Sequence, residues 1–209
     1  MTTADSTFWD SIAEKYAAKP VEDVTAFERK QAITRSLLHP AAHVLEIGCG
    51  TGSLALALAP HAGHIDAIDS SAEMIRIANT KRQTQAVANV TFTRATVDSL
   101  QSPPAHYDCV WAYSLLHLIH DRKHTLDQVF DLLKPGGTFV ASHVCLAGTW
   151  IPYGPLISLM HWLGKAPRVY LYDRKTVFEE MQHAGFVDIA ERDVGAATTV
   201  AFVVAKKPG

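Results

Sequence analysis

The chain has 209 residues, of which 48% are apolar and 19% charged, a balance typical of one globular domain and not of a disordered segment. The formal net charge of −2 excludes the overall basic field that would attract nucleic acid. The first residues contain no basic segment followed by an apolar run, so we expect no secretion signal and a cytoplasmic protein. The three cysteines, Cys49, Cys109 and Cys145, are odd in number and widely spaced, which favours free thiols over disulfides or a cysteine metal site.

Two helices are predicted before the first strand. Phe8, Ile12 and Tyr16 recur at four-residue spacing after the candidate caps Asp5 and Ser6, which predicts a helix over 5–18. A similar pattern after Asp23 predicts a helix over 23–38. We interpret residues 1–40 as a helical lid and residues 41–209 as the main domain.

Strands and helices then alternate. Apolar, β-prone segments predict strands at 43–48, 64–69, 89–96, 107–114, 138–144, 187–194 and 198–206. Helices are predicted at 53–59, from a capping box beginning at Ser70 to about Gln83, from Asp121 to the KPGG sequence, and from Asp173 to Gly185. The connection between the last two strands is too short for a parallel crossover, so they must pair antiparallel. The pattern predicts a doubly wound α/β sheet with helices on both faces.

A run of 30 residues, 135–164, lacks any Asp, Glu, Lys or Arg. Prolines and glycines interrupt it, so it is not a membrane span. We interpret it as the fifth strand followed by an apolar insertion at about 146–172 that caps the substrate. Two interpretations of the insertion compete: a pocket wall, or a face resting on a membrane or a partner. Its prominent apolar side chains are Trp150, Tyr153, Leu156, Leu159, Met160 and Trp162.

The sequence VLEIGCGTGS, residues 44–53, runs from a strand through three alternating glycines into a helix. Such a turn places backbone N–H groups at the edge of the sheet where open α/β folds bind ligands. Asp69 ends the second strand 17 residues beyond Gly52, where its carboxylate can accept both ribose hydroxyls. Asp98 follows the third strand and can accept from an adenine amino group.

These sequences, together with TVDSL, YDCVWAYSLLHLI and LLKPGGTFV, resemble the successive motifs of class I S-adenosylmethionine-dependent methyltransferases over residues 42–206. Within the family, the motif pattern is closest to the ubiquinone- and menaquinone-type enzymes acting on small molecules or lipids. The resemblance implies a Rossmann-like, seven-stranded sheet in the order 3-2-1-4-5-7-6, with strand 7 antiparallel. It implies S-adenosyl-L-methionine as the cofactor, with ribose at Asp69, adenine at Asp98 and Met74, and methionine beside the glycines, Tyr113 and Ser114. The expected cofactor-binding residues are Glu46, Gly48, Gly50, Gly52, Asp69, Ser70, Met74, Val97, Asp98, Tyr113 and Ser114.

A nicotinamide or flavin dinucleotide is the alternative cofactor. The fingerprint G-x-G-x-x-G would require glycine at position 53, where Ser53 stands. Glu46 would repel a pyrophosphate and suits a ligand that carries an ammonium and a sulfonium. Both residues favour S-adenosylmethionine.

Methyl transfer relies chiefly on positioning, so a strong catalytic motif is not required. The candidates near the methyl group are His117 and His143 as general bases, and Tyr16 on the lid. For both histidines a purely structural role is the alternative. His117, His120 and His124 could ligate a metal, but no carboxylate or cysteine completes the set, so we expect no metal ligands.

Missing features narrow the acceptor. The fourth strand is followed by AYSLLH and not by the Asp/Asn-Pro-Pro-aromatic sequence of amino-methyltransferases that act on nucleic-acid bases. No acid ends the fourth or fifth strand, which disfavours a metal-dependent, catechol-type site. We predict a metal-independent methyltransferase for a small, apolar or lipid-like acceptor. We expect no nucleic-acid partner and no transmembrane segment, although peripheral membrane contact stays open. The alternative is a non-catalytic, S-adenosylmethionine-binding regulatory module.

Overall fold

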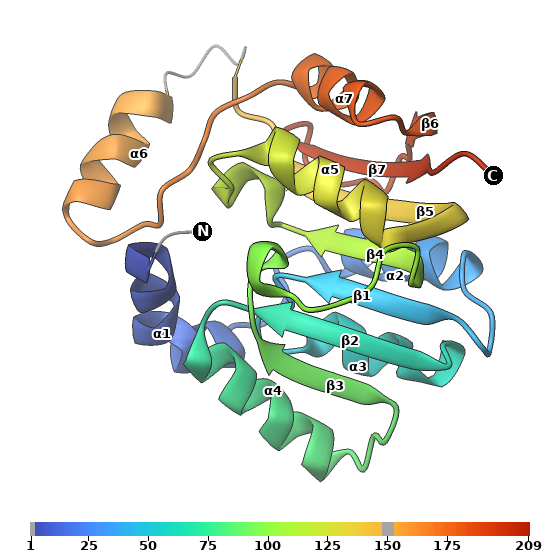
Figure 1. Ribbon diagram of the computed structural model, residues 1–209. Helices are drawn as coiled ribbons and strands as arrows, with labels where there is room; N and C mark the ends of the chain where they lie inside the picture. The colour runs from blue at the N-terminus through green and yellow to red at the C-terminus, as the bar shows by residue number, and fades with distance from the viewer. Residues whose placement is uncertain (1–2, 148–152) are drawn as a thin grey trace.

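A computed structural model describes residues 3–147 and 153–209. Its centre is a seven-stranded sheet in the order β3-β2-β1-β4-β5-β7-β6, as the sequence predicts (Figure 1). Only β7 runs antiparallel to its neighbours, β5 and β6, because the hairpin connection is short. The strands are β1 (His43–Ile47), β2 (His64–Asp69), β3 (Val90–Arg94), β4 (Tyr107–Tyr113), β5 (Leu133–Val144), β6 (Val187–Glu191) and β7 (Val200–Lys206).

Helices cover the two faces of the sheet and its carboxyl end. They are α1 (Thr3–Ala18), α2 (Val24–Ser36), α3 (Ser53–Leu58), α4 (Ala72–Thr84), α5 (Arg122–Leu132), α6 (Tyr153–Trp162) and α7 (Arg174–His183). Three 3₁₀ turns join them: η1 (Ala59–His61), η2 (Val97–Ser99) and η3 (Leu116–Leu118). One apolar core lies under α5 and α7, and a second lies between the sheet and α2, α3 and α4.

Side-chain caps explain where most helices begin. Asp23, Asp121 and Asp173 accept the backbone N–H three residues ahead, as predicted. The expected capping box at Ser70 is wrong by one residue, because Ser71 is the residue that accepts the Met74 N–H. The predicted start of the first helix is also wrong: α1 begins at Thr3, so Asp5 and Ser6 lie inside it.

The secondary structure of two segments, 53–58 and the KPGG sequence, could not be decided from their sequence patterns alone. The Leu/Ala alternation of 53–58 is a helix, and four of its residues are buried, because a helix enclosed on most sides needs no single apolar stripe. The KPGG sequence does not form a separate turn. α5 ends at Leu132, and β5 begins at Leu133, which pairs with Tyr107 before the register shifts.

The connection between β3 and β4 contains only the 3₁₀ turn η2 and a loop, residues 95–106. No helix in the described chain therefore follows β3, and Figure 1 shows the face of β1, β2 and β3 toward the viewer without a helix over it. Thr91 and Thr93 of β3 are accordingly exposed on this face. The β3 edge of this face is thus polar and exposed, whereas Leu45, Ile47 and Ile68 on β1 and β2 are buried and the β3–β4 connection packs against their core.

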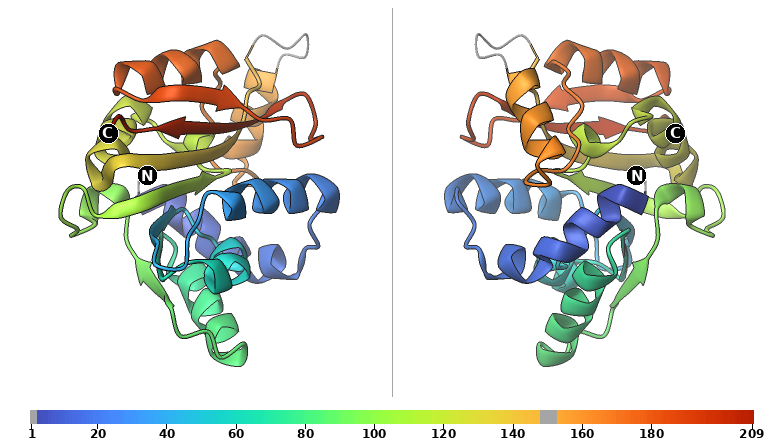
Figure 2. Two further views of the ribbon diagram at one scale, coloured as in Figure 1. Left: turned by 90° about the vertical axis from the view of Figure 1, so that its right-hand side faces the viewer. Right: turned by 90° about the vertical axis from the view of Figure 1, so that its left-hand side faces the viewer.

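The two N-terminal helices have different positions. α2 packs on the sheet face with α3, and its buried Thr34 shares a hydrogen bond with Tyr113 (2.7 Å). α1 instead lies across α4 at the carboxyl end of the strands, the side seen in the right-hand view of Figure 2. Asp10 fastens α1 there, because its carboxylate accepts from the Ser71 hydroxyl and from the Glu73 N–H. Only α1 therefore has the position expected of a lid.

The apolar insertion forms α6, which stands apart from the sheet on the same side as α1 (Figures 1 and 2). Leu156, Leu159, Met160 and Trp162 are exposed, Trp162 to 79%, so of the two interpretations of the insertion these four side chains favour the face that rests on a membrane or a partner. Tyr153 is half-buried, and Trp150 lies outside the described residues. Among the described residues, no helix combines the length and apolar character needed to cross a bilayer.

Candidate functional site

The glycine loop between β1 and α3 has a backbone conformation that favours glycine. Gly48, Gly50 and Gly52 all have positive φ angles, of 69°, 53° and 75°. At Gly52 a Cβ atom would also lie 2.5 Å from Cζ of Phe92 on β3. The loop is therefore drawn tightly against the sheet, with its backbone toward the carboxyl ends of the strands.

Asp69 ends β2 beside this loop. One carboxylate oxygen accepts the Gly50 N–H and the other accepts the Ser71 N–H, each at 2.9 Å. Burial raises the pKa of Asp69, and these two hydrogen bonds oppose that rise. The acid predicted to bind ribose therefore also holds the glycine loop against the start of α4, a second role that the spacing alone did not reveal.

Glu46 on β1 is a buried acid beneath the loop, only 2% exposed. It accepts a backbone hydrogen bond from Ala55, but its Oε2 has no hydrogen-bond partner. Burial raises its pKa to about 8, and the charge of Asp69 acts in the same direction. A buried carboxyl with a free oxygen is a ready partner for a cationic ligand group.

Two cavities adjoin along the carboxyl ends of the strands and share Gly48, Asp69 and Leu115. The first, of about 40 Å³, has polar residues on one side and apolar residues on the other. It includes the predicted Ser70, Val97 and Asp98, and apolar walls that include Ala95 and Ile119. Asp98 is largely exposed, and its carboxylate lies 3.2 Å from Nε2 of His124, a neighbour that the sequence did not predict.

The second cavity is larger, about 220 Å³, and mostly apolar. It brings together six residues predicted for the site outside the shared set: Tyr16, Gly50, Met74, Tyr113, Ser114 and His117. Met74 faces this cavity and packs with Trp9, and it does not line the cavity that contains Asp98. Met74 therefore borders a different cavity from Asp98, and its contact with an adenine ring stays a prediction.

Sequence reasoning missed several walls of the second cavity. Trp9, Leu115, Leu118, Pro167 and Val169 all line it. Trp9 is adjacent to Phe8 and so falls outside the four-residue spacing that predicted α1. Pro167 and Val169 follow α6 in a segment without periodicity. The insertion thus contributes to the cavity through the loop that follows α6. The helix α6 itself, which carries most of the apolar residues of the insertion, does not line the cavity.

The two candidate bases differ in access. His117 lines the second cavity, its Nδ1 is buried without a hydrogen-bond partner, and burial lowers its pKa to about 4. The prediction that His143 faces the methyl group is not supported by its position, because it lines neither cavity and lies 1% exposed with its ring 5.8 Å from Tyr172. Burial lowers its pKa to about 3, so both imidazoles are neutral at pH 7.

The histidines after β4 do not converge. His117 faces the cavity, His120 packs its ring on Tyr170, and His124 pairs with Asp98. Among the described residues these three histidines do not gather into a group that could hold a metal ion. The three cysteines are free and buried, as predicted.

Comparison with known proteins agrees with this geometry. Residues 44–137 match the family model described as methyltransferase domain. The chain is 32% identical over 97 residues, 46% of its length, to uncharacterized methyltransferase YcgJ of Bacillus subtilis, covering 38% of that protein. It is 31% identical over 116 residues, 56% of its length, to ubiquinone biosynthesis O-methyltransferase of Xylella fastidiosa, covering 47% of that protein. The chain thus spans less than half the length of these curated relatives.

The fold has close counterparts among solved structures. Phosphoethanolamine N-methyltransferase 2 of Haemonchus contortus, solved with phosphomonomethylethanolamine and S-adenosylhomocysteine, superposes with a TM-score of 0.73. The identity is 18%, and the match covers 87% of this chain and 53% of that chain. The sheet order, the glycine loop and the acid after β2 define a Rossmann-like methyltransferase fold. Residues 44–137, 45% of the chain, match the methyltransferase domain family, and the whole fold is that of S-adenosylmethionine-dependent methyltransferases.

Proposed function

We propose that the chain binds S-adenosylmethionine across the two cavities and transfers its methyl group to a small apolar or lipid-like acceptor. The observation that carries this proposal is the junction of the cavities at Gly48, Asp69 and Leu115, beside the glycine loop. The first cavity offers polar groups suited to an adenosine, and the second offers apolar walls and the His117 imidazole. A ligand lying across the junction would present its reactive centre to the second cavity.

The residues present fit this cofactor. The free Oε2 of buried Glu46 matches the ammonium of the methionine moiety, and Asp69 retains lone pairs for the ribose hydroxyls. Ser70, Val97 and Asp98 line the cavity assigned to adenine, whereas Met74 and Ser114 line the methionine side. When bound, the cofactor supplies an activated methyl group, and the C–S bond breaks as the acceptor–carbon bond forms.

The chain's own contribution is positioning and proton removal. Trp9, Tyr16 and Leu118 enclose the acceptor and exclude water, which brings most of the rate enhancement expected for such transfers. His117 is the assigned base for a hydroxyl acceptor: its unpartnered Nδ1 is neutral at pH 7 and receives the proton as the new bond forms. We assign His143 a packing role, because its ring lies against Tyr172 and lines neither cavity.

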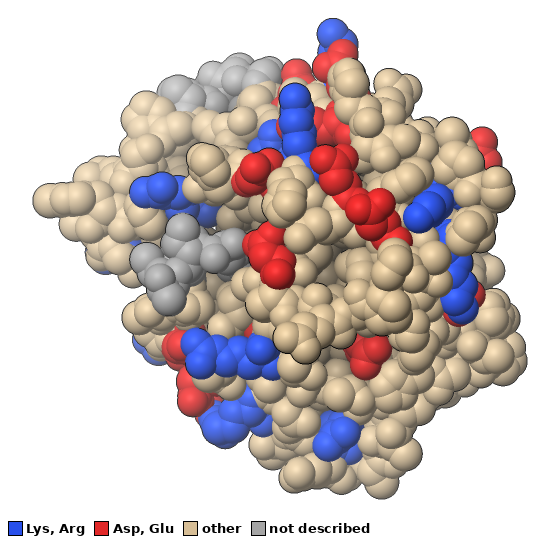
Figure 3. All heavy atoms as spheres, viewed as in Figure 1, with Lys and Arg blue, Asp and Glu red and all other residues tan. Residues whose placement is uncertain are grey.

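The apolar cavity walls support an apolar acceptor, and so does the surface of α6. Leu156, Leu159 and Trp162 are exposed on this helix, and Lys165 and Arg168 follow it. Figure 3 shows this region as a mostly uncharged lobe with basic side chains beside it. We assign α6 peripheral contact with a lipid surface, where apolar side chains insert and basic ones meet anionic headgroups.

The test uses methyl-labelled S-adenosylmethionine and a fractionated cell extract. We expect label in the fraction soluble in organic solvent, and a loss of transfer of about 10²- to 10⁴-fold in His117→Gln with cofactor affinity kept. Label recovered only in nucleic acid or protein would refute the acceptor class. Tight cofactor binding without transfer to any fraction would support the regulatory module, which no feature of the site favours.

A sedimentation assay tests the lipid surface. Vesicles with anionic lipid should carry down the native chain but not a variant in which Leu156, Leu159 and Trp162 are replaced by serine. Equal sedimentation of both proteins would exclude α6 as the contact. Unchanged binding of S-adenosylhomocysteine by the variant provides the folding control.

A further inference from the structure

A cluster of imidazoles and a carboxylate lies at the amino-terminal end of the sheet, far from the cavities. His43 is the first residue of β1 and His64 the first residue of β2, and the two are direct partners in the parallel ladder. Asp66 lies two residues beyond His64 and therefore on the same face of the sheet. At about 3.3 Å per residue, five residues of β1 separate this cluster from the glycine loop by roughly 16 Å.

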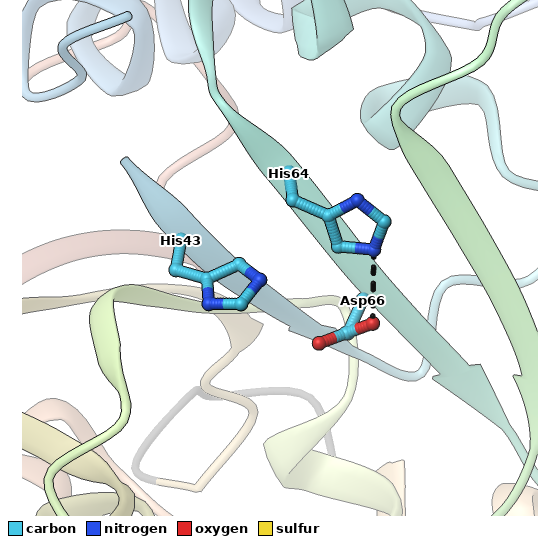
Figure 4. A group of neighbouring side chains, drawn as sticks. All are labelled: His43, His64 and Asp66. Carbon is cyan, nitrogen blue, oxygen red and sulfur yellow. Dashed lines mark ion pairs between the residues drawn. The ribbon is translucent and has the colours of Figure 1, made fainter. Parts of the chain in front are cut away.

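The three side chains point toward one another on the sheet face that no helix covers. Figure 4 shows the two imidazole rings converging on the Asp66 carboxylate. One ligand atom from each residue lies within 4.8 Å of the others, and His64 Nε2 is 3.3 Å from Asp66 Oδ1. All three residues are only partly buried, so an ion can reach them from solvent.

We propose that His43, His64 and Asp66 bind a divalent transition-metal ion, for which Zn²⁺ is the best match. Two imidazole nitrogens and one carboxylate oxygen form a donor set that Zn²⁺ commonly takes, with bonds of about 2.0–2.2 Å. Those bond lengths place tetrahedral ligand atoms about 3.4 Å apart. Small rotations of the three side chains, which lie outside the apolar cores, would bring their ligand atoms to this separation.

Neighbouring residues complete the arrangement. The His106 ring lies 4.6 Å from the His43 ring, which places a third imidazole in reach as the fourth ligand. The Tyr107 hydroxyl donates to Asp66 Oδ2 (3.2 Å) and so leaves Oδ1 facing His64. Such outer hydrogen bonds orient ligating carboxylates in metal sites.

The ion would act as a clip and not as part of the transfer reaction. It would join β1, β2 and the residue before β4 at the end of the sheet where the β3–β4 connection supplies no helix. The methyl transfer proposed above remains metal-independent, and the two proposals succeed or fail separately.

The test is zinc titration of an untagged chain by calorimetry, with a parallel cobalt titration followed by visible absorption. We expect one ion per chain, the intense absorption of tetrahedral Co²⁺, and affinity at least tenfold weaker in His64→Gln and in Asp66→Asn. The matched control is His183→Gln, which removes an exposed histidine at the end of α7 and should bind as the native chain does.

Several results would overturn the proposal. They are the absence of saturable binding by the native chain, equal affinity in all variants, or a cobalt spectrum that is purely octahedral. Circular dichroism and S-adenosylhomocysteine binding establish that each variant is folded. If a variant does not fold, the stoichiometry and cobalt spectrum of the native chain decide the outcome alone.

Discussion

Glu46 makes cofactor binding depend on pH in a range where an ordinary glutamate would not titrate. With a pKa of about 8, the carboxyl is half ionised at pH 8 and about 1% ionised at pH 6. The ligand's ammonium needs the ionised form, so affinity for S-adenosylhomocysteine should fall as the pH falls from 8 to 6. An ordinary glutamate, fully ionised above pH 6, would give no change in this range.

The size of this fall in affinity depends on whether the neutral carboxyl also binds the ammonium. If only the carboxylate binds, the fall from pH 8 to pH 6 is about 50-fold, the ratio of the two ionised fractions. If the neutral carboxyl also accepts the ammonium, with a hydrogen bond about 1 kcal/mol weaker than the charge-assisted one, the fall is only about threefold, because the carboxyl is already half neutral at pH 8. His117 and His143 do not titrate in this window, since their pKa values are about 4 and 3.

Calorimetry at pH 6, 7 and 8 in matched ionic strength measures the effect. Glu46→Gln should bind more weakly at pH 8 and show a flat profile, because its amide does not titrate. Glu22→Gln is the control, since the Glu22 side chain is 78% exposed and should keep the native profile. A native affinity that is constant from pH 6 to 8, or a slope that persists in Glu46→Gln, would refute the assignment of the ammonium to Glu46.

Three further predictions concern single side chains. Asp69→Ala should weaken S-adenosylhomocysteine binding by at least about 1.5–3 kcal/mol, measured by calorimetry, because it removes a charged acceptor and frees the glycine loop. Gly52→Ala should lower the melting temperature more than Gly136→Ala. Both glycines have positive φ, but only at Gly52 would the new Cβ atom clash with the Phe92 ring. Equal shifts in melting temperature would show that this clash does not occur. In denaturant unfolding, Glu180→Gln should cost about 3–5 kcal/mol by leaving the buried Arg122 unpaired, whereas the exposed Glu179→Gln should stay within about 0.5 kcal/mol.

Features that depend on local sequence were predictable. The alternation of elements predicted a doubly wound sheet and the short final connection predicted the antiparallel pair, whereas the strand order was implied by the family resemblance. The three aspartate caps followed from residue type next to an apolar pattern. The glycine spacing and Asp69 indicated the ligand edge of the sheet for the same reason, since both belong to single strand–turn units.

Features that depend on distant packing were not predictable in the same way. Met74 faces the second cavity because α1 lies over α4, a contact that no periodicity in either helix encodes. Ser71 and not Ser70 caps α4 because Asp69 holds the Ser71 N–H. The apolar residues of α6 looked like a pocket wall, yet apolar composition alone does not distinguish a face turned inward from one awaiting a partner.

The fastening of α1 bears on how ligand binding and movement of this helix are linked. The Ser71 hydroxyl donates to Asp10 of α1, and the Ser71 N–H donates to Asp69, so Ser71 connects α1 to the acid that borders both cavities. Displacing α1 pulls on the turn that presents Asp69, and filling the ribose position stiffens the anchor of α1. We therefore expect ligand binding at Asp69 and movement of α1 to be coupled through Ser71.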